Sequence, residues 1–142
     1  MIEYQESEQP ENSESEVVQE VYCIHLDRHK QRGRSFLTFA RSRLCSLSHD
    51  AKATKSDANL INTFKQCCSK QDEFFPPNIP LRELIFRILL ASGNQPATIE
   101  QLFDKVQYQL RNSGNMRNVT MDKLIRIVEN DNYYGIGPVK NE

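Results

Sequence analysis

The sequence predicts a mainly α-helical protein with a short β-strand edge near its C-terminus. Three observations indicate this class. Apolar residues recur at helical spacing through residues 80–128, helix-capping residues lie where these runs begin or stop, and an aromatic and glycine-rich segment, 133–137, follows the last run. We therefore expect a C-terminal domain over residues 76–142, in which three helices surround one core.

The first of these helices is expected over residues 80–92. Pro80 suits a first helical position, and Gly93 suits a left-handed stop after the last turn. The apolar residues that share one helical face are Leu81, Leu84, Ile85, Ile88 and Leu89. Phe86 and Leu90 lie off that face, so we expect this helix to be central and covered on both sides.

Two further helices and a strand are predicted after it. Thr98 and Gln101 have the spacing of a capping box, which predicts that the second helix begins near Ile99. Thr120 is expected to cap the third helix. Its predicted buried face consists of Met121, Leu124, Ile125 and Val128. The strand over 133–137 is expected to pair with residues 97–98.

Three amphipathic helices and a strand within residues 80–139 resemble the winged helix-turn-helix superfamily, and residues 93–102 are similar to the helix-to-strand-to-helix entry of those domains. The resemblance implies that the third helix contacts a DNA major groove. Its solvent face would carry Asp122, Lys123, Arg126 and Glu129, two acids and two bases. Because this balance weakens phosphate binding, the resemblance equally implies a module that docks a partner protein.

The N-terminal half is predicted to divide into an acidic tail and a basic region. Residues 1–20 contain seven glutamates and no basic residue, and residues 1–18 carry too few apolar side chains to bury, so we expect a disordered tail there. Residues 28–55 contain eight Lys or Arg and one acid, within a basic helical region expected over 19–75. The formal net charge of -1 conceals this segregation.

Within 19–75 we expect one strand and two helices. Residues 17–26 suit a short strand, Ser35 precedes one helical pattern, and Ser56 or Asp57 suits the cap of another. The predicted buried face of the first helix consists of Phe36, Phe39, Ala40, Leu44 and Leu47. The basic residues expected to project outward from it are Arg34, Arg41 and Arg43. Residues 74–75, two phenylalanines, are expected to pin this region to the C-terminal domain.

Cysteine and histidine are concentrated in the same region and suggest a zinc site. Cys45-x3-His49, like His25-x3-His29, would bring two ligand-type side chains onto one face of a helix. A metal would also stabilise a small region with a thin core. The candidate ligands are Cys23, His25, Cys45, His49, Cys67 and Cys68. The alternative is that the thiols are unliganded core residues and the histidines lie on the surface.

The function predicted from these patterns is that of a non-enzymatic accessory protein in contact with DNA, RNA or a nucleoprotein complex. The candidate nucleic-acid-binding residues are Arg28, Lys30, Arg32, Arg34, Arg41, Arg43, Lys123 and Arg126. The alternative is an adaptor whose winged helix docks a partner protein. We expect no catalysis, because the sequence has no phosphate-binding glycine loop or nucleophile elbow, and a Cys45–His49 nucleophile would lack an orienting acid.

The sequence also predicts where the protein acts. No apolar run approaches the roughly 20 residues that cross a bilayer, and an acidic beginning does not suit a secretory signal with its basic n-region. We therefore expect a cytoplasmic protein without a membrane partner, whose cysteines are reduced or bound to metal.

Overall fold

The computed structural model describes residues 19–115 and 117–139, and the tail expected over 1–18 lies outside them. Within this part the α-helices are α1 (Leu26–Gln31), α2 (Phe36–Arg41), α3 (Asp57–Gln66), α4 (Leu81–Ala91), α5 (Ile99–Asn112) and α6 (Met121–Asn130). The 3-10 helices are η2 (Ser46–Ala53), η3 (Cys68–Lys70) and η4 (Asp72–Phe74), and the strands are β1 (Val21–Ile24), β2 (Ala97–Thr98) and β3 (Ile136–Pro138). The mainly helical class with a small β-sheet is confirmed.

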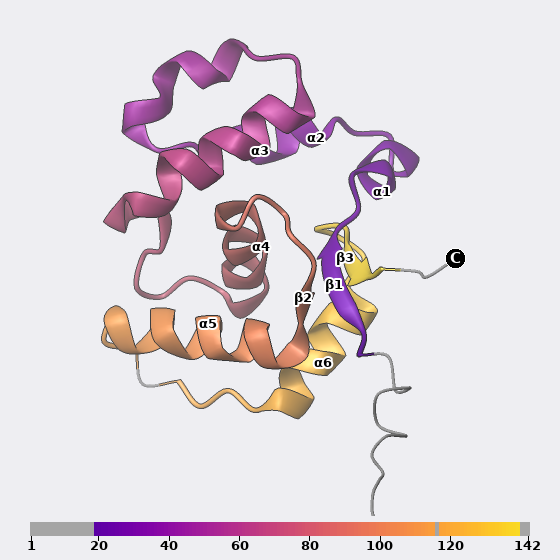
Figure 1. Ribbon diagram of the computed structural model, residues 1–142, viewed down its shortest axis with the longest axis vertical. Helices are drawn as coiled ribbons and strands as arrows, with labels where there is room; N and C mark the ends of the chain where they lie inside the picture. The colour runs from indigo at the N-terminus through magenta and orange to yellow at the C-terminus, as the bar shows by residue number, and fades with distance from the viewer. Residues whose placement is uncertain (1–18, 116, 140–142) are drawn as a thin grey trace, which may run out of the picture.

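Helix α4 lies at the centre of the molecule, as its apolar pattern predicts. Figure 1 shows α3 on one side of it, α5 on the other, and the sheet with α6 beside them. Phe86 and Leu90, which lie off the main apolar stripe, are both fully buried. Burial on several sides of one helix is the arrangement expected when apolar residues extend beyond a single face.

The helix ends follow the capping residues. Thr98 Oγ1 accepts the amide of Gln101 at 3.2 Å, and Gln101 Oε1 accepts the amide of Thr98 at 2.9 Å, so the predicted capping box is present at the start of α5. Thr120 caps α6 by accepting the amide of Lys123. Gly93 ends α4 with φ of +76°, in the left-handed region that glycine adopts without a Cβ penalty.

The three strands form an antiparallel sheet in the order β2-β1-β3. The predicted pairing of the C-terminal strand with residues 97–98 is wrong, because β1 lies between the two. The side chain of Asn94 holds β1 there: its Oδ1 accepts the amide of Ile24 at 2.7 Å, and its Nδ2 donates to the Ile24 carbonyl at 2.9 Å. Tyr22 and Ile24 alternate inward and are buried, which fixes the register.

The helix expected from Ser35 through Leu47 is shorter than predicted. Ser35 caps α2 as expected, by accepting the amide of Thr38, but α2 ends at Arg41. Beyond a turn, the amide of Cys45 donates to Cys68 Sγ at 3.2 Å, and the chain re-enters a helix only as η2. Leu47 therefore lies on η2 with an exposed fraction of 70%, and its placement in the core was wrong.

The basic region and the C-terminal domain share one hydrophobic core. The ring of Phe74 is buried and lies 5.6 Å from that of Phe64 in α3 and 5.0 Å from that of Phe75. Arg87 of α4 donates to the Phe74 carbonyl at 3.0 Å. Phe74 thus joins the two regions as predicted, while Phe75 packs against the same core half-buried.

Candidate functional site

Two arginines of the basic region are bound by other residues of the protein. Arg34 Nε donates to His29 Nδ1 at 3.0 Å, its Nη2 donates to the Tyr133 carbonyl, and its guanidinium lies 4.2 Å from the centre of the Phe39 ring. Arg43 makes a two-pronged contact with Glu83, with its Nε 2.8 Å and its Nη2 2.9 Å from the two carboxylate oxygens. Neither guanidinium is available to bind phosphate without breaking these contacts.

Arg28 and Arg41 also bind other residues of the protein, through backbone carbonyls. Arg28 Nη1 donates to the carbonyl of Ile136 in β3 at 2.9 Å, and Arg41 Nη2 donates to the Thr54 carbonyl at 2.8 Å. Arg34, Arg41 and Arg43 are half-buried, so the expectation that they project into solvent was wrong. The physical reason is that a guanidinium carries five donors, which satisfy carbonyls at the ends of short elements. The candidate basic residues that remain exposed are Lys30, Arg32, Lys123 and Arg126.

Glu83 lies between two arginines. Arg43 comes from the link between α2 and η2, and Arg87 lies one turn further along α4. The Glu83 Oε2 atom is 2.8 Å from Nε of each. Burial by itself would raise the pKa of the Glu83 carboxyl, but the hydrogen bonds and charges of the two guanidinium groups outweigh burial and lower that pKa to about 2. The carboxylate is therefore ionised at neutral pH and links α4 to the basic region.

His29, which contacts Arg34, is fully buried. Its Nε2 lies 2.7 Å from the Tyr134 carbonyl, and its Nδ1 accepts from Arg34. Because a carbonyl only accepts, the proton belongs on Nε2 and the ring is neutral. Burial lowers the pKa of His29, and the positive charge of Arg34 acts in the same direction, against the hydrogen bond to Tyr134.

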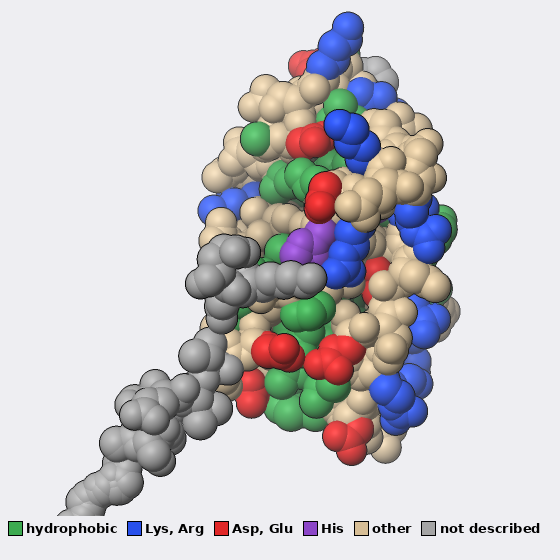
Figure 2. Space-filling view, turned by 90° about the vertical axis from the view of Figure 1, so that its right-hand side faces the viewer, with side chains coloured by type: hydrophobic (Ala, Val, Ile, Leu, Met, Phe, Trp, Pro, Cys, Tyr) green, Lys and Arg blue, Asp and Glu red, His purple; other side chains and the backbone are tan. Residues whose placement is uncertain are grey.

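The four charged residues expected on the solvent face of α6 are all exposed. Glu129 lies toward the sheet, where its carboxylate accepts the hydroxyl of Tyr22 at 3.0 Å. Lys123 lies toward α4, in the wall of a groove. Figure 2 shows acidic side chains gathered on the lower part of the sheet side and basic side chains along its right-hand edge. Glu129 and Lys123 thus face different neighbours, the sheet and α4.

A groove of about 700 Å³ lies between the first turn of α4, the exposed side of α6 and the turn that follows α6. We call it the α4–α6 groove. The residues that line it are Pro80, Leu81, Arg82, Lys123, Ile127, Asn130, Asp131, Asn132, Tyr133 and Tyr134. Arg82 and Lys123 are exposed and form no ion pair within the described part of the chain. Tyr133 exposes 51% of its surface beside them.

The groove also contains one carboxylate, Asp131, which backbone amides hold in place. Its two carboxylate oxygens accept the backbone amides of Tyr133, Tyr134 and Ile136 at 2.9–3.2 Å. These bonds fix the turn that presents Tyr133. The groove therefore combines two unpaired cations, one amide-bound carboxylate, side-chain amides and an aromatic ring. Its cations outnumber its acid, and an exposed ring lies beside them, a combination that suits a phosphate-bearing chain with exposed bases. Sequence reasoning missed Arg82, because nothing in the pattern of α4 distinguishes it from an ordinary solvated position.

Five of the six candidate metal ligands lie in two places. On β1 and just after it, Cys23 Sγ lies 4.0 Å from His25 Nε2, and that nitrogen also lies 3.0 Å from the Pro138 carbonyl, which requires it to carry the proton. Cys45, Cys67 and Cys68 meet elsewhere, around Ser48. The side chain of His49 lies outside the described part of the structure.

No group of three or more His, Cys, Asp or Glu side chains suited to a metal ion is found among the residues that the structure describes. The zinc site stays a prediction, which metal analysis of the purified protein tests. Burial would raise the pKa of the Cys45 thiol, but hydrogen bonds from Ser48 and from the neighbouring thiols outweigh it and lower that pKa. Burial raises the pKa of Cys68 to about 11.

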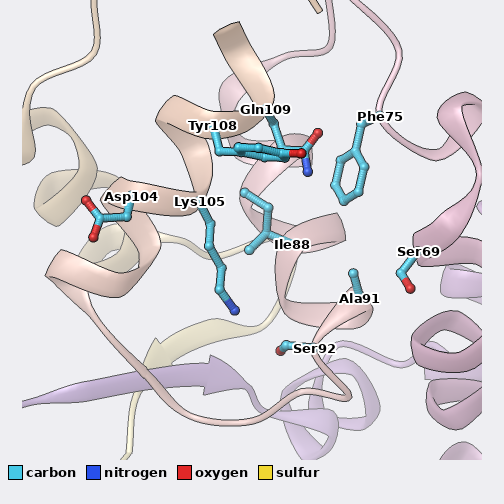
Figure 3. Close-up of a pocket in the computed structure, with 9 residues that line it drawn as sticks. All are labelled: Ser69, Phe75, Ile88, Ala91, Ser92, Asp104, Lys105, Tyr108 and Gln109. Carbon is cyan, nitrogen blue, oxygen red and sulfur yellow. The ribbon is translucent and has the colours of Figure 1, made fainter. Parts of the chain in front are cut away.

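A second hollow lies near the C-terminal end of α4, against α5. It has a volume of about 280 Å³. Figure 3 shows the rings of Tyr108 and Phe75 beside Ile88, with Lys105 and Asp104 at one end. Tyr108 exposes 57% of its surface there. An apolar side chain of a partner protein would fit this hollow.

Comparison with protein-family models, with curated proteins and with solved structures found no match for this chain. Among the described helices, none is long and apolar enough to cross a membrane. The α4–α6 groove combines two exposed cations, Arg82 and Lys123, with the exposed ring of Tyr133.

Proposed function

We propose that this protein is a non-enzymatic accessory factor that contacts a nucleic acid through the α4–α6 groove. The observation that carries the proposal is the pairing of two exposed cations, Arg82 and Lys123, with the exposed ring of Tyr133 in one groove. The cations would neutralise phosphates, and the ring would stack on a base. Lys30, Arg32 and Arg126, also exposed, would add non-specific attraction.

The arrangement of the elements supports this proposal. Helix α4, β2, α5, α6 and β3 follow one another in the order of a winged-helix domain, and β1 supplies the central strand of the sheet. In that superfamily, side chains near the start of the third helix approach the nucleic acid. Lys123 occupies the first turn of α6, the third helix of this set.

A salt titration with a matched pair of variants tests the proposal. Binding of fluorescein-labelled 20-mer DNA, single-stranded and duplex, is measured by anisotropy at several salt concentrations for the wild type and for Arg82→Glu/Lys123→Glu. Each lost phosphate contact lowers the slope of log K against log salt by about 0.9 on duplex DNA, so we expect the double variant to lose about 1.8. The control, Lys52→Glu/Arg111→Glu, has the same net charge but changes exposed cations outside the groove.

Equal weakening by the groove variant and the control would show that only net charge matters, and would contradict the proposal. A wild-type protein without salt-sensitive affinity for either DNA or for a matched RNA would also contradict it. Reversal of Arg34, Arg41 or Arg43 is not a usable test, because it would break contacts inside the protein and so change the fold together with the surface charge.

The second candidate is an adaptor that docks a partner protein, and the hollow beside α5 favours it. Tyr108, Phe75 and Ile88 there form an apolar surface with one charge of each sign at its end. The substitution Tyr108→Ala would remove the exposed ring with little effect on the core, because Tyr108 is mostly exposed. Loss of a partner in crosslinking mass spectrometry with Tyr108→Ala, together with unchanged DNA binding, would favour the adaptor.

A further inference from the structure

Three cysteines meet where η2, α3 and η3 join. Cys45 precedes η2, Cys67 ends α3, and Cys68 begins η3. The Ser48 hydroxyl oxygen lies 3.5 Å from Cys45 Sγ and 3.3 Å from Cys68 Sγ. The sulfurs of Cys45 and Cys67, 22 positions apart in the chain, are separated by 3.6 Å. This distance is van der Waals contact between two thiols that are not bonded.

The three thiols differ in their access to solvent. Cys68 is fully buried, and its sulfur is held by the amide of Cys45 at 3.2 Å. Cys45 exposes only 3% of its surface, whereas Cys67 is half-buried, with part of it at the surface. A reagent from solvent therefore reaches Cys67 first and finds Cys45 as the adjacent sulfur.

We propose that Cys67 is a site of oxidative thiol modification and that Cys45 converts the modified thiol into a Cys45–Cys67 disulfide. The oxidant is a small disulfide, such as glutathione disulfide. This inference does not depend on the proposed nucleic-acid contact, because no residue of the α4–α6 groove takes part in it.

The reaction has two exchange steps. The Cys67 thiolate attacks one sulfur of the oxidant, so that a mixed disulfide forms, the oxidant S–S bond breaks and one thiolate leaves. The Cys45 thiolate then attacks the Cys67 sulfur and displaces the second thiolate. Each departing thiolate takes up the proton that a protein thiol released. The protein dithiol loses two electrons and two protons, and the oxidant is reduced to two thiols.

The second step requires the two sulfurs to move together. To reach the S–S length of about 2.05 Å from 3.6 Å, they must approach by roughly 1.5 Å. Both cysteines lie at the ends of elements: Cys45 has extended backbone at φ -76°, ψ 167°, and Cys67 follows the last residue of α3. The product would tie the end of α3 to the start of η2.

The experiment oxidises the full-length protein with glutathione disulfide, blocks the remaining thiols with N-ethylmaleimide and measures the intact mass. The chain has four cysteines, so we expect four labels before oxidation and two afterwards. Tandem mass spectrometry of the tryptic peptides 44–52 and 66–70 should show a link from Cys45 to Cys67. The variants Cys23→Ser and Cys68→Ser should still lose two labels, whereas Cys67→Ser should lose none by this route.

Three results would overturn the proposal. The first is a mixed disulfide that stays at Cys67 without a second exchange, and the second is a crosslink from Cys45 to Cys68 or Cys23. The third is one equivalent of zinc in the purified protein that Cys67→Ser abolishes, because a metal would then hold these thiols. Peptide mapping of the wild type decides the first two outcomes even if a variant fails to fold.

Discussion

Replacement of Glu83 by Gln tests the contact that joins the basic region to α4. Glu83 is 13% exposed and lies between Arg43 and Arg87, and its pKa falls from 4.5 to about 2. At about 1.36 kcal/mol per pH unit, this difference corresponds to about 3 kcal/mol of stability at neutral pH. Glu83→Gln keeps the shape but leaves two guanidinium groups without a counter-charge, so we expect a loss of about 3 kcal/mol.

The pH dependence of the unfolding free energy tests the same contact independently. Because the folded-state pKa of Glu83 lies below its value in the unfolded chain, the contribution is present above about pH 4.5 and is lost as the pH falls toward 2. The difference in unfolding free energy between the wild type and Glu83→Gln should therefore shrink from pH 5 to pH 2. At pH 7 the full difference should be present.

Urea unfolding followed by far-UV circular dichroism measures both quantities, since the chain has no tryptophan for fluorescence. The control is Glu100→Gln, an exposed glutamate in the first turn of α5, which should cost no more than about 0.5 kcal/mol. A loss below about 1 kcal/mol for Glu83→Gln at pH 7 would refute the reasoning. A difference that persists undiminished at pH 2 would also refute it.

Three further outcomes follow from single contacts. Burial holds the pKa of His29 below 6.5, so titration of its ring by NMR should give a midpoint under that value. The free energy of unfolding should fall as the pH drops below about 6.5, because the unfolded chain then binds the proton more readily. A midpoint at or above 6.5 would contradict burial of the neutral ring. A methyl group on Gly137 would overlap the Arg28 guanidinium, so Gly137→Ala should cost about 1–3 kcal/mol in urea unfolding, and much less in an Arg28→Ala background. Thr98→Ala should cost about 1 kcal/mol by the same assay, and Thr98→Ser should restore most of it; equal losses would argue against the capping box.

The core and the ends of α4, α5 and α6 could be predicted because their causes are local. A capping hydroxyl acts on an amide three residues away, and an apolar stripe requires only that residues three and four apart share a face. As expected, α5 begins after Thr98, α6 begins after Thr120, and α4 ends before Gly93. The predicted stripe of α6 is an exception. Ile127 is buried although it lies outside that stripe, whereas Met121 and Ile125, which were expected in it, are only half-buried.

The candidate site could be predicted only in part. Lys123 was expected on the reading face, and it lines the α4–α6 groove. Its partners Arg82 and Tyr133 come from segments about 40 and 10 positions away, and only packing of α4 against α6 and the Asp131 turn brings them together. Likewise, the contact between Cys45 and Cys67 depends on where α2 ends, which the apolar pattern through Leu47 did not indicate.

By itself the sequence determined the helical class, the central position of α4 and the caps, since these depend on periodicity and on hydrogen bonds within one turn. The tertiary structure decided which charges remain available. A run of arginines in a sequence predicts a basic surface, because the sequence does not show which distant acceptors bind them. Here three of the arginines are bound by Glu83, the Tyr133 carbonyl and the Ile136 carbonyl. The placement of β1 between β2 and β3 was likewise a tertiary outcome, because strand pairing joins residues more than 70 positions apart.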